Sequence, residues 1–434
     1  MSQRGRLTVA REAVTSDVMT IALPGTWHEA EGAGLADFYR DLHAHPELSF
    51  QEHRTAQRVQ EAIAPLGLEV TAGVGGTGVV AVLRNGAGPV VLLRADFDAL
   101  PVREKTGLAY ASTVLTADAE GADVPVMHAC GHDMHAAALV GALKLLNGSK
   151  NSWSGTVVAI FQPAEEVGGG ANAMIADGLF DRFPKPEVVL GQHVAPLPAG
   201  MIAYKTGPAM AAADAVKLQL FGRGGHGSQP ESTIDPVVMS ANVVQRLQTI
   251  VSRQLSPFEP AVVTVGYLRA GSKENIIPDD AEMGINVRSF TAEVREKVLA
   301  SIARIATAEA HASGAEQDPA LTTMYSFPVT TVDDAVMQQI ATDFRNHFGE
   351  ARVIESNQPV AGSEDVGYYG SELGVPTAFW FWGGFDDERI AQAAAQRKPL
   401  PSNHSPEFAP VIEPTLSTGV EALTIAALSQ LGKR

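Results

Sequence analysis

The segment His128–His135 contains three histidines, an aspartate and Cys130, which is the only cysteine among 434 residues. His132 stands two positions after this cysteine. A thiolate beside an imidazole is a ligand pair for zinc and similar transition metals. We expect a helix over 134–146 with Asp133 as its N-cap, and its positive end should make the thiol easier to ionise. This concentration of ligand types favours a metal site over an inert, buried cysteine.

Two adjacent carboxylates, Glu165 and Glu166, follow a predicted strand, and His193 ends another. Metal-assisted hydrolysis needs one carboxylate on the metal and a second one that takes a proton from water. A proline before the pair and three glycines after it indicate a turn, in which neighbouring side chains can face one site. In open parallel sheets, ligand sites lie beyond the carboxyl ends of the strands. We expect these residues to meet there with His404 from a C-terminal loop, although each segment alone also fits a solvated surface.

Asp96 and Asp98 follow a third predicted strand and share one face by the two-residue period of a strand. A carboxylate in this position can bind the second nitrogen of a metal-ligating histidine and fix its orientation. An aspartate that caps a loop fits the same pattern. The residue types alone leave both interpretations open.

The elements that must position these residues alternate along the chain. Apolar runs predict buried strands, and helical patterns such as 133–146 separate several of them. The predicted strands cover 78–83, 90–94, 156–161 and 188–192. This order indicates an α/β fold with a mainly parallel sheet that helices cover on both faces.

Near residue 210 the order changes to strand, helix, strand, strand, helix, strand. A β-α-β-β-α-β unit of this ferredoxin-like kind can bury a core of its own. We therefore predict an N-terminal extension (1–32), a discontinuous metal-binding catalytic domain (33–210 and 330–434) and an inserted domain (211–329).

The composition limits the class of protein. A chain of 434 residues is longer than one core usually supports, in agreement with two domains. Its formal net charge of −17 argues against nucleic acid or an anionic membrane as a partner. No apolar run approaches the roughly 20 residues of a membrane span, and none resembles a signal peptide. With only one cysteine, the chain is expected to be a soluble protein of the reducing cytoplasm.

Taken together, eight motifs resemble those of the M20 metallopeptidases. The likeness is to the amidohydrolase branch, which includes hippurate hydrolases, N-acyl-amino-acid deacylases and auxin-conjugate hydrolases. The motifs are Asp41–Leu48, Arg94–Pro101, Met127–His135, Phe161–Glu166, Gly224–Gly227, Asn275–Pro278, Gly362–Asp365 and Asn403–Pro406. So many segments in the right order make the resemblance specific.

The resemblance implies two divalent metal ions, zinc or manganese before cobalt or nickel, with one ligand shared between them. The implied ligands are Cys130, His132, Glu166, His193 and His404. Glu165 would be the general base and proton shuttle while a metal-bound hydroxide attacks an amide carbonyl. Asp98 would belong to the catalytic machinery beside the ligands.

The inserted domain would be the lid and dimerisation domain of this family. By resemblance, His226 in its first loop would stabilise the oxyanion in the partner subunit's active site. Asn275 and Arg288 would bind the free carboxylate of the amino-acid product, for which a guanidinium is well shaped. Glu231 departs from the family pattern, which often has a histidine there.

The sequence thus predicts a metal-dependent amidohydrolase that cleaves N-acyl-amino acids, or similar small amides, to a carboxylic acid and an amino acid. A carboxypeptidase or dipeptidase acting on short peptides is the nearest alternative. A non-catalytic small-molecule binder is disfavoured by Glu165, because binding alone needs no proton shuttle. A hydrolase with Cys130 as nucleophile would survive removal of metal, and a metal enzyme would not.

Overall fold

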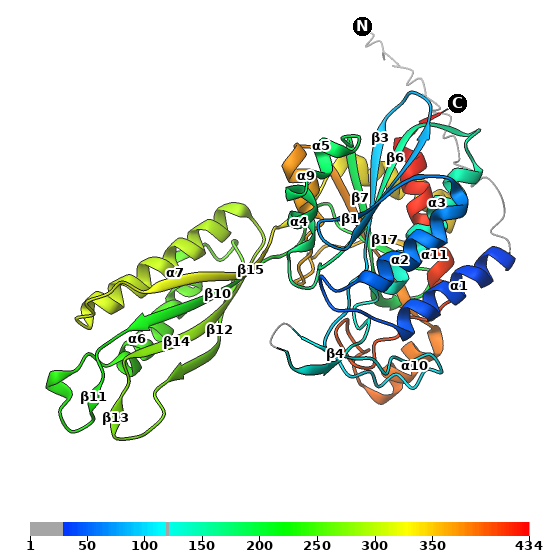
Figure 1. Cartoon of the computed structure of the whole chain (residues 1–434). Helices are drawn as coiled ribbons and strands as arrows, with labels where there is room; N and C mark the ends of the chain where they lie inside the picture. The colour runs from blue at the N-terminus through cyan, green and yellow to red at the C-terminus, as the bar shows by residue number, and fades with distance from the viewer. Residues whose placement is uncertain (1–28, 119–120, 434) are drawn as a thin grey trace, which may run out of the picture.

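The computed structural model describes residues 29–118 and 121–433, arranged as a large α/β part and an elongated smaller part (Figure 1). The expected N-terminal extension lies outside the described residues up to residue 28. Its last four residues belong to helix α1, Glu29–Ala44, which begins before the helical pattern that the sequence predicts over 35–43. Two glycines near this start lower the helix propensity and obscure it in the sequence.

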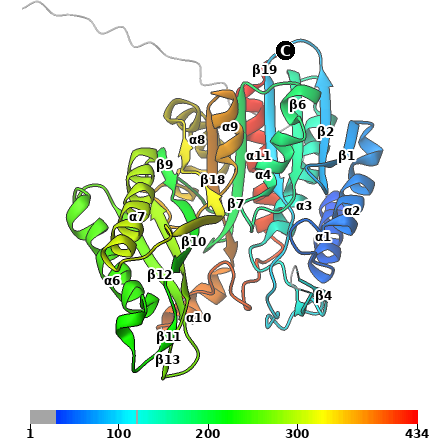
Figure 2. The same cartoon turned by 60° about the vertical axis from the view of Figure 1, so that its left-hand side comes forward.

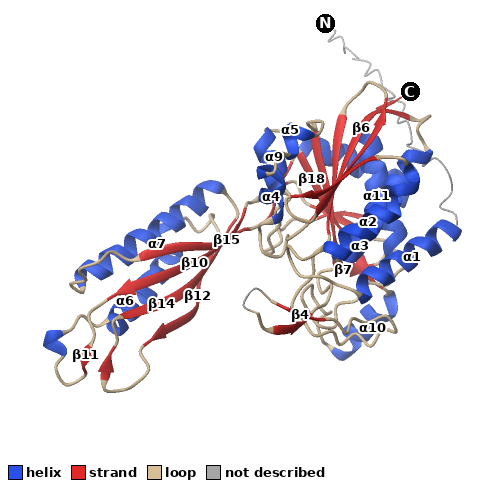
Figure 3. Ribbon diagram, in the orientation of Figure 1, coloured by secondary structure: helices blue, strands red, loops and turns tan. Residues whose placement is uncertain are grey.

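The large part is built around a sheet whose central strands are parallel (Figure 3). Its strand order is β1-β2-β6-β3-β7-β18-β8-β17, with β19 paired to β6. β6, β3, β7 and β18 run parallel, whereas β1, β2, β8 and β19 are joined through antiparallel pairs and β17 pairs parallel with β8. The mainly parallel sheet is as predicted. The strands are β1 (Glu69–Val74), β2 (Gly78–Asn85), β3 (Val90–Asp96), β6 (Trp153–Gln162), β7 (Val188–Pro198), β8 (Ile202–Tyr204), β17 (Val353–Glu355), β18 (Thr377–Phe385) and β19 (Gly432–Lys433).

Helices cover both faces of this sheet (Figures 1 and 2). On one face, α3 and α11 pack against each other and on β3 and β7, with α1, α2 and α8 beside them. On the other, α4 and α9 lie against β6 and β7. These helices and their neighbours are α2 (His53–Ile63), α3 (His132–Gly148), α4 (Gly170–Ala176), α5 (Leu179–Arg182), α8 (Asp334–Phe348), α9 (Gly367–Leu373), α10 (Asp387–Gln396) and α11 (Thr415–Gln430).

The start of α3 differs from the prediction. Its N-cap is Gly131, with a φ of 87° in the left-handed region, and not Asp133. A side chain at Gly131 would collide with Val194 on β7, so the helix and the strand approach each other closely here. Asp133 lies in the first turn of α3, where its carboxylate contacts His43 Nδ1 at 2.6 Å. The aspartate therefore ties α3 to α1 instead of capping the helix.

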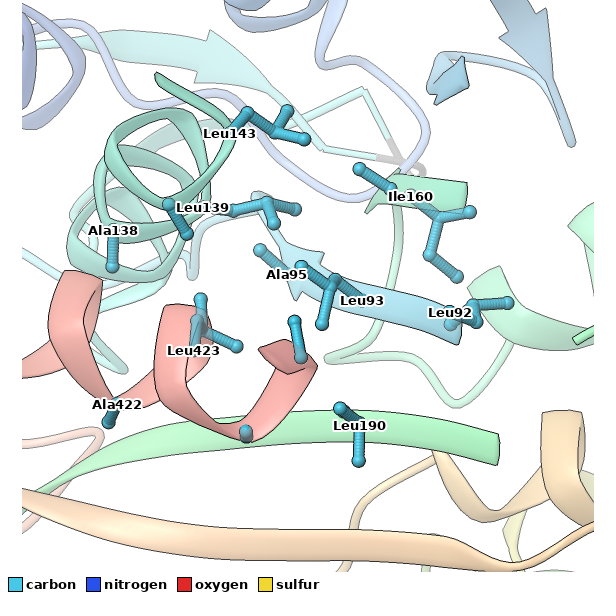
Figure 4. Packing of buried hydrophobic residues seen from close by; sticks show 14 of the residues in the cluster. Leu92, Leu93, Ala95, Ala138, Leu139, Leu143, Ile160, Leu190, Ala422 and Leu423 are labelled. Atoms are coloured by element: carbon cyan, nitrogen blue, oxygen red, sulfur yellow. The ribbon is translucent and has the colours of Figure 1, made fainter. Parts of the chain in front are cut away.

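The core of the large part holds α3 rigidly on the sheet (Figure 4). Leu93 on β3, Leu139 on α3 and Leu423 on α11 are fully buried. Burial of each such side chain stabilises the fold by about 1.5–3 kcal/mol. Gly141 lies so close to Val420 that a Cβ would collide with it. This close packing fixes the N-terminal end of α3, which carries the cysteine–histidine motif.

The smaller part contains a four-stranded antiparallel sheet in the order β12-β14-β10-β15. Helices α6 and α7 lie side by side and pack on it around a separate core that includes Leu218, Met283 and Val298. A short ribbon of β11 and β13 lies at the far end (Figure 1). The elements are β10 (Ala212–Phe221), β11 (Gly225–His226), α6 (Pro236–Thr249), β12 (Ala261–Ala270), β13 (Ile276–Ile277), β14 (Asp280–Ser289), α7 (Ala292–Ala312) and β15 (Ala320–Phe327).

The chain leaves and re-enters the large part at adjacent points. Strands β9 (Gly207–Met210) and β16 (Thr330–Val332) pair antiparallel, with Met210 opposite Thr330. A separate hairpin of β4 (Leu115–Ala117) and β5 (Asp123–Pro125) lies in a long loop of the large part. Among the described helices, none combines the length and apolarity that crossing a bilayer requires.

Candidate metal centre and active site

Five ligand-type side chains from four distant segments meet at the carboxyl edge of the parallel strands. His193 lies inside β7 and not at its end as predicted, because β7 continues to Pro198 alongside β18. Cys130 Sγ lies 3.4 Å from Nε2 of His193. Nε2 of His404 lies 3.3 Å from Oε2 of Glu166, and Nε2 of His132 lies 3.8 Å from Oε1 of the same glutamate. The structure therefore brings together all five residues predicted as metal ligands.

These side chains form two overlapping groups whose ligand atoms lie within 4.8 Å of one another. One contains Cys130, His132 and His193, and the other contains Cys130, Glu166 and His404. A metal bonded at 2.0–2.3 Å places tetrahedral ligand atoms about 3.3–3.8 Å apart. The 3.4 Å between Cys130 and His193 and the 3.3 Å between Glu166 and His404 match this spacing. Cys130 is common to both groups.

Two buried ligand atoms without hydrogen-bond partners also indicate a site for divalent cations. His132 Nε2 and Glu166 Oε1 are buried without a hydrogen-bond partner in the described part of the chain. Buried polar atoms are normally hydrogen-bonded, so two atoms without a hydrogen bond that face the same space indicate a missing partner.

The backbone also sets the histidine tautomers. Nδ1 of His132 donates to the Asp98 carbonyl oxygen at 2.9 Å, and Nδ1 of His193 donates to the Val194 carbonyl oxygen at 2.7 Å. In the neutral rings both Nε2 atoms then face the metal position. Against the effect of burial, Asp96 and Asp98 raise the pKa of His132 to about 10, so a metal ion would displace a proton from its Nε2.

The raised pKa values of the ligand side chains also indicate that a bound cation belongs to the site. Burial, with Glu166 and Glu165 nearby, raises the pKa of the Cys130 thiol well above its ordinary value. Burial raises the pKa of Glu166 to about 8. The expectation that the helix start makes this thiol easier to ionise is therefore wrong for the protein alone. Desolvation and neighbouring carboxylates outweigh the helix dipole, and only a bound cation would favour the thiolate.

Asp98 connects three parts of the site. Its Oδ1 lies 3.2 Å from Nδ1 of His132, so the ring contacts both the carbonyl and the carboxylate of this residue. The same carboxylate accepts hydrogen bonds from the backbone N–H groups of Glu165 and Glu166, each at 3.1 Å. Asp98 thus fixes the orientation of a predicted ligand together with the turn that carries both glutamates.

The glutamate turn is held in an uncommon backbone conformation. Ala164, directly before the pair, has a φ of 50°, and His404 has a φ of 70°. Residues with side chains rarely adopt this left-handed region, and such conformations concentrate at functional sites. The N–H of Ala164 donates to buried Glu52 at 2.9 Å. Glu52 therefore stabilises the turn that directs Glu165 and Glu166 toward the ligands.

Glu165 belongs to neither group that contains Cys130, but its carboxylate also lies within 4.8 Å of ligand atoms of His132 and Glu166. It is buried, and burial together with Glu364 and Glu166 raises its pKa well above the ordinary value. A carboxylate in this environment accepts a proton readily. This property suits a general base next to a metal-ligating glutamate.

Arg94 neutralises the carboxylates behind Glu165. Its guanidinium is fully buried and contacts Asp96 at 2.7 Å, Glu364 at 2.7 Å and Asp365 at 2.8 Å. Glu364 and Asp365 stand 270 residues away in the Gly-Ser-Glu-Asp motif. The motif was noted in the sequence, but its pairing with Arg94 has no local signal.

We expect Arg94→Ala to destabilise the protein by about 3–5 kcal/mol, because it leaves three buried carboxylates without their cation. Urea unfolding followed by circular dichroism measures the loss. The matched control is Arg84→Ala, since Arg84 and Glu69 form an exposed pair worth at most about 1 kcal/mol. Equal losses in the two variants would contradict the structural role of Arg94.

His135 is a further member of the site that the sequence indicated only as part of a histidine cluster. Its Nδ1 hydrogen-bonds to Asp96, and its Nε2 accepts from the N–H of Val194 at 3.0 Å. Both ring nitrogens are therefore occupied. Asp96, His132 and His135 also lie close enough to form a ligand group, but the hydrogen bonds of His135 indicate that it positions the backbone of β7 next to His193.

A cavity of about 540 Å³ opens over the ligands between the two parts of the molecule. Arg288 on β14 lines it and donates through Nη1 to Ser363 Oγ at 2.7 Å. The lining residues are Cys130, Glu165, Glu166, His193, Met210, Arg288, Tyr325, Phe327, Val360, Ala361, Gly362, Ser363, Phe381, Ser402, Asn403 and His404. The volume suits a small molecule.

His226 and Asn275 do not line this cavity. His226 belongs to β11 and Asn275 directly precedes β13, and the N–H of Gly227 donates to the Asn275 carbonyl at 2.9 Å. Both are exposed, and the ribbon of β11 and β13 lies at the end of the smaller part away from the large part (Figure 1). Within one described chain, His226 and Asn275 therefore lie apart from the eight other residues predicted for the site.

Fold, ligand groups and cavity together define a candidate metal site in an α/β protein, and comparison with known proteins gives the family. Residues 92–397 match the model of peptidase family M20/M25/M40. The chain belongs to this family, as the sequence motifs predicted, and is a hydrolase.

Two relatives illustrate the range of this family. The chain is 38% identical to a hippurate hydrolase of Campylobacter jejuni, over 76% of this chain and 82% of the relative. It is 36% identical to thermostable carboxypeptidase 1 of Saccharolobus solfataricus, over 90% of this chain and 93% of the relative.

Among solved structures, the YXEP protein of Bacillus subtilis is described as a dinuclear metal-binding peptidase of the M20 family. It matches with a TM-score of 0.72 and 30% identity, over 93% of this chain and 100% of that one.

Proposed function

We propose that this protein is a metal-dependent amidohydrolase that cleaves N-acyl-amino acids to a carboxylic acid and an amino acid. The observation that carries the proposal is the meeting of buried Cys130, His132 and His193 with partly buried Glu166 and exposed His404 beside Glu165. The relative named hippurate hydrolase supports this substrate class, and the dinuclear relative supports two metal ions. Zinc and manganese suit the mixture of thiol, imidazole and carboxylate ligands, as do cobalt and nickel.

In this mechanism, divalent ions held by the five ligands would polarise the amide carbonyl and lower the pKa of water. Glu165 accepts the proton of the attacking water and then delivers it to the leaving nitrogen. Asp98 holds the His132 ring and both glutamate backbones in place during these transfers. Arg288 binds the free carboxylate of the amino-acid part of the substrate.

We further propose that residues 211–329 form a ferredoxin-like lid through which two copies of the chain associate. The order of its four main strands and two helices supports this domain type. In such a homodimer, His226 and Asn275 reach the active site of the partner subunit, which accounts for their distance from the ligands of their own chain. His226 then stabilises the developing oxyanion. The cytoplasm is the proposed compartment, since the single cysteine is free and buried.

A carboxypeptidase acting on short peptides is the second candidate, because a peptide bond to a C-terminal residue requires the same chemistry. The relative named thermostable carboxypeptidase 1 supports it. A carboxylate clamp at Arg288 serves both substrates equally. Only the group on the acyl side distinguishes the two activities.

The test is hydrolysis of N-acetyl, N-benzoyl and longer N-acyl amino acids and of dipeptides by the metal-reconstituted enzyme. We expect turnover of N-acyl-amino acids that disappears after chelation and returns when metal is added back. Mass spectrometry of the products identifies the preferred acyl group. Turnover that persists in the chelated sample would instead support Cys130 as a nucleophile, and exclusive cleavage of dipeptides would support the second candidate.

A further inference from the structure

A chain of hydrogen bonds crosses the smaller sheet next to the cavity. Nε of Arg288 donates to Oδ1 of Asn286 at 3.2 Å, and Nδ2 of Asn286 donates to the hydroxyl oxygen of Tyr325 at 3.1 Å. Because a guanidinium can only donate, it fixes the amide with its NH₂ group toward the tyrosine. Tyr325 is therefore an acceptor from Asn286, and its own O–H proton is free to donate elsewhere.

The strand register explains how these side chains meet. Asn286 on β14 and Tyr325 on β15 are both paired with Ala215 on the central strand β10. They stand two strands apart, a separation of about 9–10 Å. The methyl group of Ala215 leaves room for them to meet above it. A larger side chain at this position would keep the amide and the phenol apart.

Both ends of this series of hydrogen bonds, Arg288 and Tyr325, reach the cavity. Arg288 and Tyr325 line it together with Glu166 and Cys130. Nε and Nη1 of Arg288 bond to Asn286 and Ser363, while Nη2 makes no hydrogen bond within the described residues. The tyrosine packs edge-to-face against Phe327, with ring centroids 5.9 Å apart, which restrains its ring.

We propose that Tyr325 is a substrate-binding residue and that its hydroxyl, with Nη2 of Arg288, forms a two-donor site for the free carboxylate of the substrate. Asn286 is the positioning residue that directs the Tyr325 proton into the cavity. This inference rests on the proposed function and makes the enzyme specific for amides with a carboxylate next to the scissile bond. Amides without that carboxylate leave both donors unpaired in the cavity, which penalises their binding.

The test compares N-benzoylglycine with N-benzoylglycinamide, which lacks the carboxylate. We expect Tyr325→Phe to lower kcat/KM for N-benzoylglycine roughly 10- to 100-fold, the range for one hydrogen bond to a charged group, chiefly through KM. Hydrolysis of the glycinamide should change less than about three-fold, the spread expected when no such bond is lost. Tyr267→Phe is the matched control, because the Tyr267 hydroxyl bonds to Glu282 on the same sheet and does not line the cavity. An equal loss on both substrates, or no loss, would overturn the proposal.

Ala215→Val provides a second variant, which separates Asn286 from Tyr325 without removing either group. It should reproduce the selective loss on N-benzoylglycine. Calorimetric binding of N-benzoylglycine to metal-loaded Glu165→Gln, with and without Tyr325→Phe, separates this proposal from the proposed function. Weaker binding in the double variant, with no turnover by the wild type, would refute the amidohydrolase and support the carboxylate site. Turnover by the wild type, together with equal binding of N-benzoylglycine with and without Tyr325→Phe, would support the amidohydrolase and refute the carboxylate site.

Discussion

Replacing Glu165 by glutamine is expected to lower kcat by roughly 10²–10⁴-fold, the usual contribution of a general acid–base group. The amide keeps the size of the side chain but cannot take a proton from water. Because Glu165 belongs to neither ligand group around Cys130, the metal content should remain that of the wild type. Steady-state kinetics and elemental analysis of the same samples measure both quantities.

The control for this variant is Glu69→Gln, which changes an exposed glutamate paired with Arg84 and should leave kcat unchanged. Loss of metal together with activity would assign Glu165 to the ligands instead of the proton transfer. Mixing Glu165→Gln with His226→Ala subunits extends the experiment. Mixed dimers should regain activity, since one site then combines an intact glutamate with the partner's intact histidine. Failure to regain activity would argue against the proposed action of His226 across subunits.

The second large effect is expected at Cys130, the one side chain shared by both ligand groups. Cys130→Ala should remove a ligand from each metal position and reduce the content of both ions, with activity falling to background. His404→Ala removes a ligand only from the group with Glu166. This variant should therefore lose the ion of that group and retain the ion held by the other group. Elemental analysis after dialysis at defined free metal concentrations distinguishes the two patterns.

His347→Ala is the appropriate control, because His347 is an imidazole paired with Glu421 outside the site. It should retain both ions. If Cys130→Ala binds metal as well as this control does, the cysteine is not a ligand. Equal metal loss in Cys130→Ala and His404→Ala would contradict the sharing of Cys130 between the two groups.

Several features of the fold could be predicted because their signals are local. The apolar runs that become β3, β6 and β7 follow from side-chain pattern alone, and so does their parallel pairing, since helices separate them. The start of α3 was predicted less well. Asp133 has the residue type of an N-cap, but the close approach of Val194 requires glycine at 131 and frees the aspartate to contact His43.

The sequence by itself determined the types of the candidate ligands and their order along the chain, because metal chemistry selects residue types. Only the tertiary structure decided which atoms meet. It places Cys130 in both ligand groups, pairs Arg94 with Glu364 across 270 residues, and raises the pKa of the Cys130 thiol through burial and nearby carboxylates. Contacts, desolvation and charge pairing depend on long-range packing, and no local pattern encodes them. For the same reason Tyr325 could not be recognised in the sequence, because the asparagine that directs its proton lies on another strand.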